Sequence, residues 1–304
     1  MTRSTFTLTT ALAVLLALGV VLLDTHVRLS DAGPGCPDWP DCAGQLIGPE
    51  ANTAYPRRPV EPGEARKEIM LHRLLAGALG LVVLGLAIAA WRGRRRRHDL
   101  PLAQPLILVA LVVVQWGLGM LTVTLPVKPL VATAQLAGGM ATLGAACWML
   151  LGRLDPGPSL RLHHFRPWAI GGLLLLCCQI LLGGWLSTND AYPVPEMDAR
   201  AAIEIAHRLG ALVMTLYLGT FGILLYRAST TARQHILAEV LLAALALQVC
   251  LGVTDSFAHL PLSVAVAHHC GAAVLLLTLL TVIRALGART RTDPARARIP
   301  VYSR

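Results

Sequence analysis

Residues 115–139 read QWGLGMLTVTLPVKPLVATAQLAGG, and residues 248–272 read QVCLGVTDSFAHLPLSVAVAHHCGA. Each segment is the end of one apolar run, a short turn and the start of the next run. Glycines recur at matching places, and Gln135 and His268 each stand 20 residues after the glutamine that opens their segment. The chain therefore carries an internal repeat built from pairs of helices.

The composition places the chain in a membrane. Its 304 residues are 55% hydrophobic and 14% charged, with a mean hydropathy of +0.61, which is too apolar for a soluble domain of this length. The apolar runs are continuous rather than alternating, so they predict helices and exclude a barrel of strands. The formal net charge of +9 comes from basic residues gathered in a few short segments. It orients the protein and requires no nucleic-acid partner.

Apolar runs of about 20 residues, the length that crosses a bilayer, predict eight transmembrane helices. We expect them at 6–25, 69–91, 104–125, 130–151, 168–187, 201–226, 236–255 and 262–285. The second and sixth also match each other, as LHRLLAGALG (71–80) and AHRLGALVMT (206–215). The predicted fold is an all-α integral membrane protein of two tandem four-helix bundles, residues 1–152 and 153–304. Because each half has an even number of spans, a pseudo-two-fold axis along the membrane normal relates them.

Basic residues predict the orientation. They open the chain and follow the second, fourth, sixth and eighth predicted helices, for example as RGRRRRH at 92–98. An excess of Lys and Arg marks the cytoplasmic side, so both termini are predicted to be cytoplasmic. The loops at 26–67 and 188–200 then face outward. The first apolar run has no clear small-residue cleavage site, so we expect an uncleaved span rather than a signal peptide.

Three histidines stand inside predicted helices at similar depth. His72 and His207 are each followed by Arg, and His268 enters the eighth helix from the same side of the membrane. An ionisable side chain within a span is costly and usually functional. Two facing neutral imidazoles in a helical bundle commonly hold haem iron. We therefore predict a haem on His207 and His268, with Arg73 and Arg208 placed to neutralise haem propionates.

Other interpretations of these histidines stay open. A single histidine in a span often makes one interhelical hydrogen bond, and small residues beside it let helices pack. That explanation suffices for each histidine alone, but not for a repeated HR pair with a third histidine at matching depth. Zinc would need further Cys, His or carboxylate ligands. A small-molecule transporter would share the repeat but leaves the histidines unexplained.

Cys36 and Cys42 lie in the outward loop GCPDWPDCAG, residues 35–44. On the predicted orientation this loop is in an oxidising compartment, and its Pro and Gly residues favour turns, so the two cysteines can form a disulfide. Two interpretations fit this cysteine pair. It is either a structural disulfide that holds the long loop together, a staple, or a redox-active pair. The residues alone favour the staple, because a thiol pair in a loop carries no signal of reactivity.

Six stretches of the chain follow one another in a recognisable order. They are VRLSDAGPGCPDWPDCAG (27–44), EIMLHRLLAG (68–77), LVATAQLAGG (130–139), GGWLSTN (183–189), AHRLGAL (206–212) and AVAHHCGA (265–272). Together they resemble the haem A synthase family of cytochrome oxidase assembly, over nearly the whole chain. The resemblance implies eight spans in two halves, and oxidation of the C8 methyl of haem O to the formyl group of haem A.

The resemblance also implies roles for single residues. His207 and His268 match the C-terminal ligands of the family, which hold a haem b. His72 matches one ligand of the N-terminal site, where the substrate haem O binds. Glu68 resembles the acidic residue before that histidine, which implies a catalytic part in proton handling or substrate positioning.

The family's outward cysteine pair, which serves electron transfer or structural support, is matched by Cys36 and Cys42. The resemblance therefore makes the redox-active interpretation of this pair as strong as the staple. Many relatives carry a second cysteine pair in the loop after the fifth helix, but this chain has none there.

Other departures from the family fall at the N-terminal site. Gln135 stands where the family has a histidine, and a carboxamide is a poor iron ligand beside imidazole. His72 would then be the one strong axial ligand, which either opens a position for oxygen chemistry or means a changed or lost substrate site. Glu68 lies four positions before His72, where the family more often has three. His269 is a reserve ligand, but neighbouring helix residues point about 100° apart, so it and His268 cannot face one iron.

We therefore predict a haem A synthase-type membrane oxidoreductase of a bacterial inner membrane, with haem b as cofactor and haem O as substrate. The leading alternative is a haem-binding electron-transfer or oxidase-assembly protein without synthase activity, which Gln135 favours. Membrane lipid, the haem O synthase and a second copy of the chain are candidate partners. The sequence does not identify the electron donor.

Overall fold

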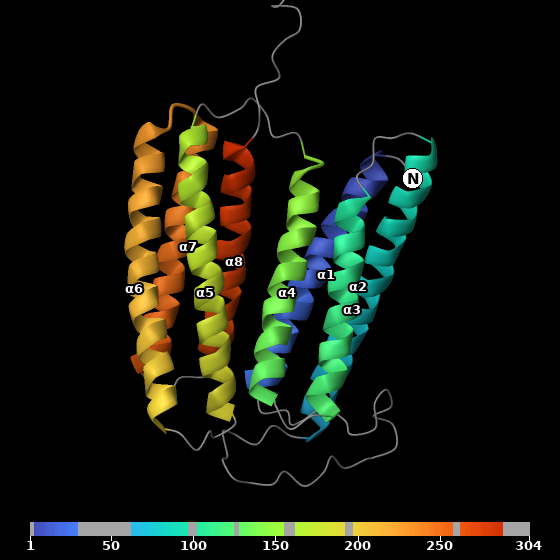
Figure 1. Cartoon of the computed structure of the whole chain (residues 1–304), viewed down its shortest axis with the longest axis horizontal. Coiled ribbons are helices and arrows are strands. Elements are labelled where there is room, and N and C mark those ends of the chain that lie inside the picture. Colours follow the sequence, from blue (N-terminus) through green and yellow to red (C-terminus); the bar gives the residue numbers. More distant parts are fainter. Residues whose placement is uncertain are drawn as a thin grey trace, which may run out of the picture.

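The structure is a computed structural model that describes residues 3–29, 62–96, 102–124, 128–154, 162–191, 197–257 and 262–287. Every regular element within these residues is helical. The elements are α1 (Arg3–Leu29), α2 (Pro62–Arg96), α3 (Ala103–Thr124), α4 (Lys128–Leu151), the short 3₁₀ helix η1 (His163–Phe165), α5 (Arg166–Ala191), α6 (Met197–Ala228), α7 (Ala232–Phe257) and α8 (Leu262–Leu286). The long helices stand side by side and alternate in direction (Figure 1).

All eight long helices in the described part of the chain are long and apolar enough to cross a membrane. This confirms the predicted all-α membrane class. The structure extends some helices beyond their predicted apolar cores, most clearly α2, which begins at Pro62. Proline suits the first turn of a helix, where its missing N–H is not needed. Glu68 therefore lies on α2, one turn before His72, rather than in the preceding loop.

The helices pack as two rings of four. In the first ring α1 contacts α2 and α4, and α3 contacts the same two helices; α5, α6, α7 and α8 repeat this pattern. Figure 1 shows the two groups as separate clusters, and they meet where α1 and α4 contact α5 and α8. The boundary at residue 152 and the pseudo-two-fold axis stay predictions.

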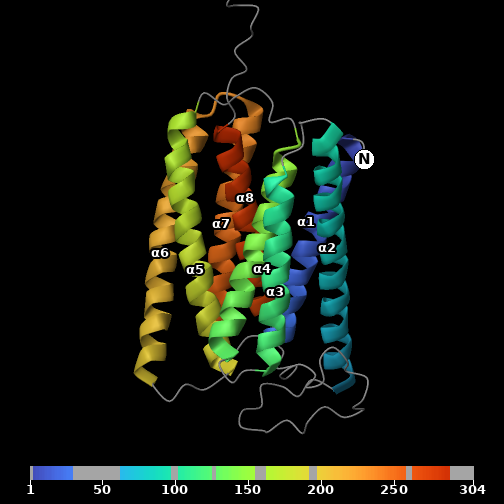
Figure 2. The ribbon, with the colours of Figure 1, turned by 45° about the vertical axis from the view of Figure 1, so that its right-hand side comes forward.

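The helices α4 and α8 form the centre of the molecule (Figure 2). Buried residues make up 50% of the most apolar window of α4 and 56% of that of α8, against 11% for α3. Gly144 of α4 lies at this contact, where a Cβ would be at an ordinary van der Waals distance, 3.4 Å, from Cδ1 of Leu280 on α8. Small residues let membrane helices pack closely in this way. The central helices are also the ones that carry Gln135 and His268.

Cys36 and Cys42 lie outside the described residues. The predicted disulfide or redox pair therefore stays a prediction.

Candidate functional site

His72, His207 and His268 lie in the first part of α2, α6 and α8. Helix direction alternates, so all three are at the end of the molecule where α1 and α5 finish (Figure 1). His72 and His207 each stand ten residues after the first residue of their helix. The structure thus places the three histidines at one end of the bundle, as the sequence predicts.

The structure brings His207 and His268 together in the second ring of helices, close enough to interact electrostatically. Each imidazole lies over a glycine of a neighbouring helix. A Cβ at Gly183 of α5 would be 3.0 Å from Cε1 of His207, and a Cβ at Gly252 of α7 would be 2.8 Å from Cε1 of His268. Side chains larger than hydrogen at these glycines would displace the rings.

The two imidazoles differ in their hydrogen bonds. The amide nitrogen of Gln248 lies 3.3 Å from Nε2 of His268. An amide nitrogen only donates, so this imidazole nitrogen accepts. Nδ1 of His207 is buried and has no hydrogen-bond partner among the described residues. A buried polar atom without a partner is rare in a native protein and calls for an explanation, such as a ligand.

His269 is hydrogen-bonded within its own helix. Its Nδ1 lies 2.9 Å from the backbone oxygen of Ala265, and since a carbonyl only accepts, the ring donates. The rings of His268 and His269 are nearly perpendicular, with an interplanar angle of 88°. His269 is therefore held by its own helix.

In the first ring of helices, α1 supplies partners to both predicted residues of α2. Nδ1 of His26 lies 3.1 Å from Oε2 of Glu68, and Oδ1 of Asp24 lies 4.0 Å from Nε2 of His72. The sequence analysis did not assign a role to Asp24 or His26. The sequence did contain one signal for such a role. Asp24 is an acidic residue inside an apolar run, close to the end of the first helix.

Gln135 occupies a place in α4 that resembles the place of His268 in α8. Its backbone carbonyl accepts a 2.9 Å hydrogen bond from the side chain of Gln115, the counterpart of Gln248. A Cβ at Gly119 would lie 4.0 Å from the amide nitrogen of Gln135, just as one at Gly252 would meet His268. The repeat in the sequence is thus a repeat of contacts at these positions.

The two arginines predicted near propionates differ in their surroundings. Arg208 is 60% exposed and forms an ion pair with Glu204, one turn earlier on α6. Arg73 is half-buried on α2. Their roles toward a haem stay predictions.

A third arginine, Arg28 on α1, was missed by the sequence analysis. Its Nη1 donates to Ser187 Oγ at 3.0 Å and to Thr188 Oγ1 at 3.3 Å. Both hydroxyls are on α5, so Arg28 links the two rings of helices. Its place in the last turn of α1, next to a loop, gave no sign of this contact.

The described residues contain no group of three or more His, Cys, Asp or Glu side chains able to hold a metal ion. A metal ion held by protein side chains alone needs such a group of ligands. Haem iron is different, because the porphyrin supplies four nitrogens and the protein adds only axial ligands. Two close imidazoles, one with an unpartnered buried nitrogen, fit that need.

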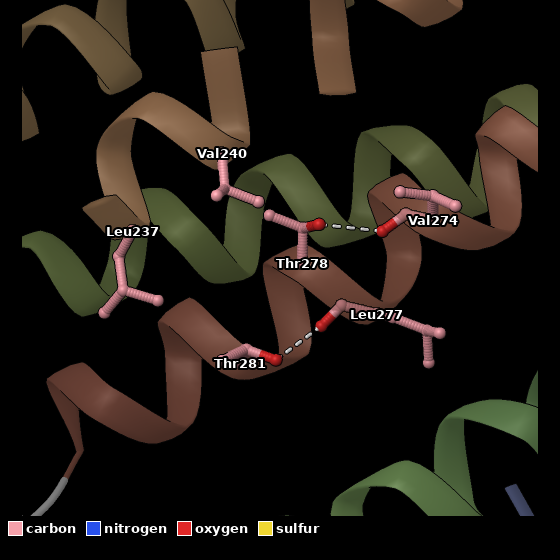
Figure 3. A pocket seen from close by; sticks show the side chains of 6 residues that line it. All are labelled: Leu237, Val240, Val274, Leu277, Thr278 and Thr281. Carbon is pink, nitrogen blue, oxygen red and sulfur yellow. Dashed lines mark hydrogen bonds between the residues drawn. The ribbon is translucent and has the colours of Figure 1, made fainter. Parts of the chain in front are cut away.

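An apolar hollow between α7 and α8 is a separate feature (Figure 3). It is lined by Leu237, Val240, Val274, Leu277, Thr278 and Thr281. The two threonine hydroxyls donate to backbone oxygens one turn earlier on α8, so they can only accept a hydrogen bond from a ligand. The lining contains no side chain that ligates iron.

The chain is similar to known proteins over most of its length. A family model described as "Cytochrome oxidase assembly protein" (COX15-CtaA) matches residues 7–280. Heme A synthase of Shewanella oneidensis is 35% identical over 309 residues, which cover 86% of this chain and 91% of that protein. Heme A synthase of Allorhizobium ampelinum is 28% identical over 323 residues, which cover 87% of this chain and 86% of that protein. The chain belongs to the COX15-CtaA family of cytochrome oxidase assembly proteins.

Proposed function

We propose that this chain is a haem A synthase, a membrane oxidoreductase that supplies haem A for cytochrome oxidase. The observation that carries this proposal is the similarity to heme A synthases over nearly the full length of both proteins. The placement of three histidines at one end of an eight-helix bundle supports it. The same similarity argues against the alternative of a haem-binding protein without synthase activity.

The substrate is haem O, whose C8 methyl group is oxidised to a formyl group. We assign its binding site to the first ring of helices, beside His72. Half-buried His72 is a strong axial ligand in this region, and Glu68 lies one turn away on the same helix. The His26–Glu68 pair can hold and exchange a proton close to the substrate.

The second ring of helices holds a haem b, which when bound supplies one-electron transfer. His207 and His268 are its axial ligands. Gly183 and Gly252 make room for the two rings. This half of the chain thus binds the cofactor rather than the substrate.

The protein spans a bacterial inner membrane with both termini in the cytoplasm. The support is the distribution of basic residues, which follow α2, α4, α6 and α8. Both haem sites then lie near the outer surface, on the side of the loop that contains Cys36 and Cys42. That loop is a candidate route for electrons, while membrane lipid, the haem O synthase and a second copy of the chain are candidate partners.

The direct test is haem A production in cells that make haem O but lack their own synthase. Extracted haems are separated and identified, and the purified protein is assayed by the pyridine haemochrome spectrum. We expect haem A with the wild-type chain and bound haem b in the purified protein. A folded, haem-loaded protein that forms no haem A would contradict the proposed function.

Substitution of the ligands tests the two sites separately. His207→Ala and His268→Ala should each abolish the bound haem b, whereas His72→Ala should retain it and lose haem A production. His163→Ala is the control, because His163 is exposed in η1 at the opposite end of the bundle. Unchanged haem b in either ligand variant would reject the assignment.

A further inference from the structure

Arg28 has an unusual environment for a charged side chain in the described part of the chain. Its Nη1 donates to two hydroxyls of α5, but its Nε and Nη2 are buried and have no hydrogen-bond partner among the residues that the structure describes. The hydroxyls of Ser187 and Thr188 are neutral, and Thr188 in turn donates to the backbone oxygen of Gly184 at 2.6 Å. A buried charge that is neither paired nor fully hydrogen-bonded is costly.

The positions of the two unpartnered nitrogens of Arg28 indicate which chemical group fits them. Nε and Nη2 lie on one edge of the planar guanidinium group, and their N–H bonds are parallel. This edge matches the two oxygens of a carboxylate, which it binds through two hydrogen bonds. Asp24 attracts the guanidinium electrostatically, but this carboxylate faces His72 at 4.0 Å. The free edge of Arg28 thus fits a carboxylate that the described residues do not supply.

The location of Arg28 indicates where such a carboxylate comes from. Thr188 lies five residues beyond Gly183, the glycine under the His207 ring, and so about 7 Å farther along α5 toward its end. Arg28 also lies close enough to His269 on α8 for their charges to interact. The guanidinium is therefore beside the paired imidazoles, displaced toward the membrane surface. A haem held by those imidazoles presents two propionates on one edge of its macrocycle.

We propose that Arg28 binds a propionate carboxylate of the haem on His207 and His268, through Nε and Nη2, with Ser187 and Thr188 fixing the guanidinium from the other side. Helix α1 of the first half thereby completes the haem site of the second half. The proposal rests on the proposed haem b site and adds to it a residue from the other half of the chain. It also explains why a cation is buried where α1 meets α5.

The test compares two probes that differ only at the propionates. Purified full-length protein without haem is titrated with ferric protohaem and with its dimethyl ester, and the Soret band reports binding. The wild-type protein should bind protohaem at least about tenfold more tightly than the ester, the scale expected for a hydrogen-bonded charge pair. In Arg28→Gln this preference should disappear. Protohaem should bind the variant more weakly than the wild type, whereas the ester, which has no carboxylate, should bind both equally.

Two further variants keep the result interpretable. Arg28→Lys retains the positive charge but lacks the two parallel N–H groups of the guanidinium. Its preference for protohaem should therefore lie between those of the wild type and Arg28→Gln. Arg227→Gln is the matched control, since Arg227 is exposed in the last turn of α6 at the other end of the bundle. It should keep the full preference. The midpoint potential of the bound haem should become more negative in Arg28→Gln alone, because a positive charge near the haem stabilises its reduced form.

The outcomes separate the proposals. A wild-type protein that binds neither probe would overturn the haem site and the role of Arg28 together. A wild-type protein that binds both probes equally would overturn the role of Arg28 alone. An anionic lipid headgroup could offer the same charge; if vesicles of phosphatidylglycerol stabilise the wild type but not Arg28→Gln, while both keep the preference for protohaem, the ligand is the lipid and the proposal fails.

Discussion

The amide nitrogen of Gln248 lies 3.3 Å from Nε2 of His268, one of the two ring nitrogens through which an imidazole binds iron. Gln115, its counterpart in the first half, instead donates to the backbone carbonyl of Gln135 at 2.9 Å. Between them, the two glutamines show two ways to donate to the next helix. One donates to a side chain and the other to the backbone. We expect Gln248 to move from the imidazole to the backbone when haem binds.

Gln248→Met removes this competing hydrogen bond while keeping the length of the side chain. We expect haem to bind a few-fold more tightly, because a hydrogen bond worth about 1 kcal/mol no longer has to be broken. Titration of the haem-free protein, followed by the Soret band, measures this. Gln115→Met is the control and should leave the affinity of the second-half site unchanged. Weaker binding in Gln248→Met would mean that the amide supports His268 in the bound state.

Gly252→Ala should weaken haem binding by at least about fivefold. The new methyl group would lie 2.8 Å from Cε1 of His268, and overpacking of this kind costs about 1–3 kcal/mol. Gly119→Ala is a matched control in the other half, since its methyl group would lie 4.0 Å from the nearest atom of Gln135. Haem content per purified chain distinguishes the two. Equal haem content in both variants would show that the His268 ring is free to shift.

Glu68→Gln should lower haem A production by at least about a hundredfold, the lower end of the usual contribution of a group that transfers protons. His26→Ala should act in the same direction, because it removes the partner that lies 3.1 Å from the Glu68 carboxylate. Bound haem b should stay at the wild-type level in both, since the pair lies in the first half. Glu239→Gln, at an exposed position of α7, serves as the control. Loss of haem b together with activity would indicate a structural role instead.

Gln135→His restores the histidine that the family has at this position. It tests whether Gln135 leaves an open position on the iron or impairs the synthase. Gln135 lies next to Gly119, as His268 lies next to Gly252, so we expect the new histidine to be a second axial ligand for the haem near His72. The spectrum should gain a low-spin component, and haem A production should fall because the open iron position is closed. A rise in haem A production would mean that the natural chain is an impaired synthase.

Much of the site was predictable from the sequence because its signals are local. The repeated HR pair, and the equal 20-residue intervals to Gln135 and His268, locate the histidines on their helices. The intervals also indicate that Gln115 and Gln248 occupy equivalent positions on their helices. In the structure each of them contacts the residue 20 positions later, on the following helix.

The partners on α1 were not predictable in the same way. Asp24, His26 and Arg28 lie within five residues of one another, yet they contact His72, Glu68 and Ser187 on two different helices. Which of them faces α2 and which faces α5 depends on how α1 is rotated about its axis. Sequence spacing gives the angle between side chains on one helix, but not the direction in which the helix presents them.

By itself the sequence determined the eight spans, because a bilayer requires about 20 apolar residues per helix and penalises every charge within them. The tertiary structure alone decided which polar groups meet. It packed α1 of the first half against α5 and α8 of the second, so that Arg28 reaches α5 while one edge of its guanidinium has no partner among the described residues. Those contacts join residues far apart in the chain, and their geometry is set by the packing of whole helices rather than by any local pattern.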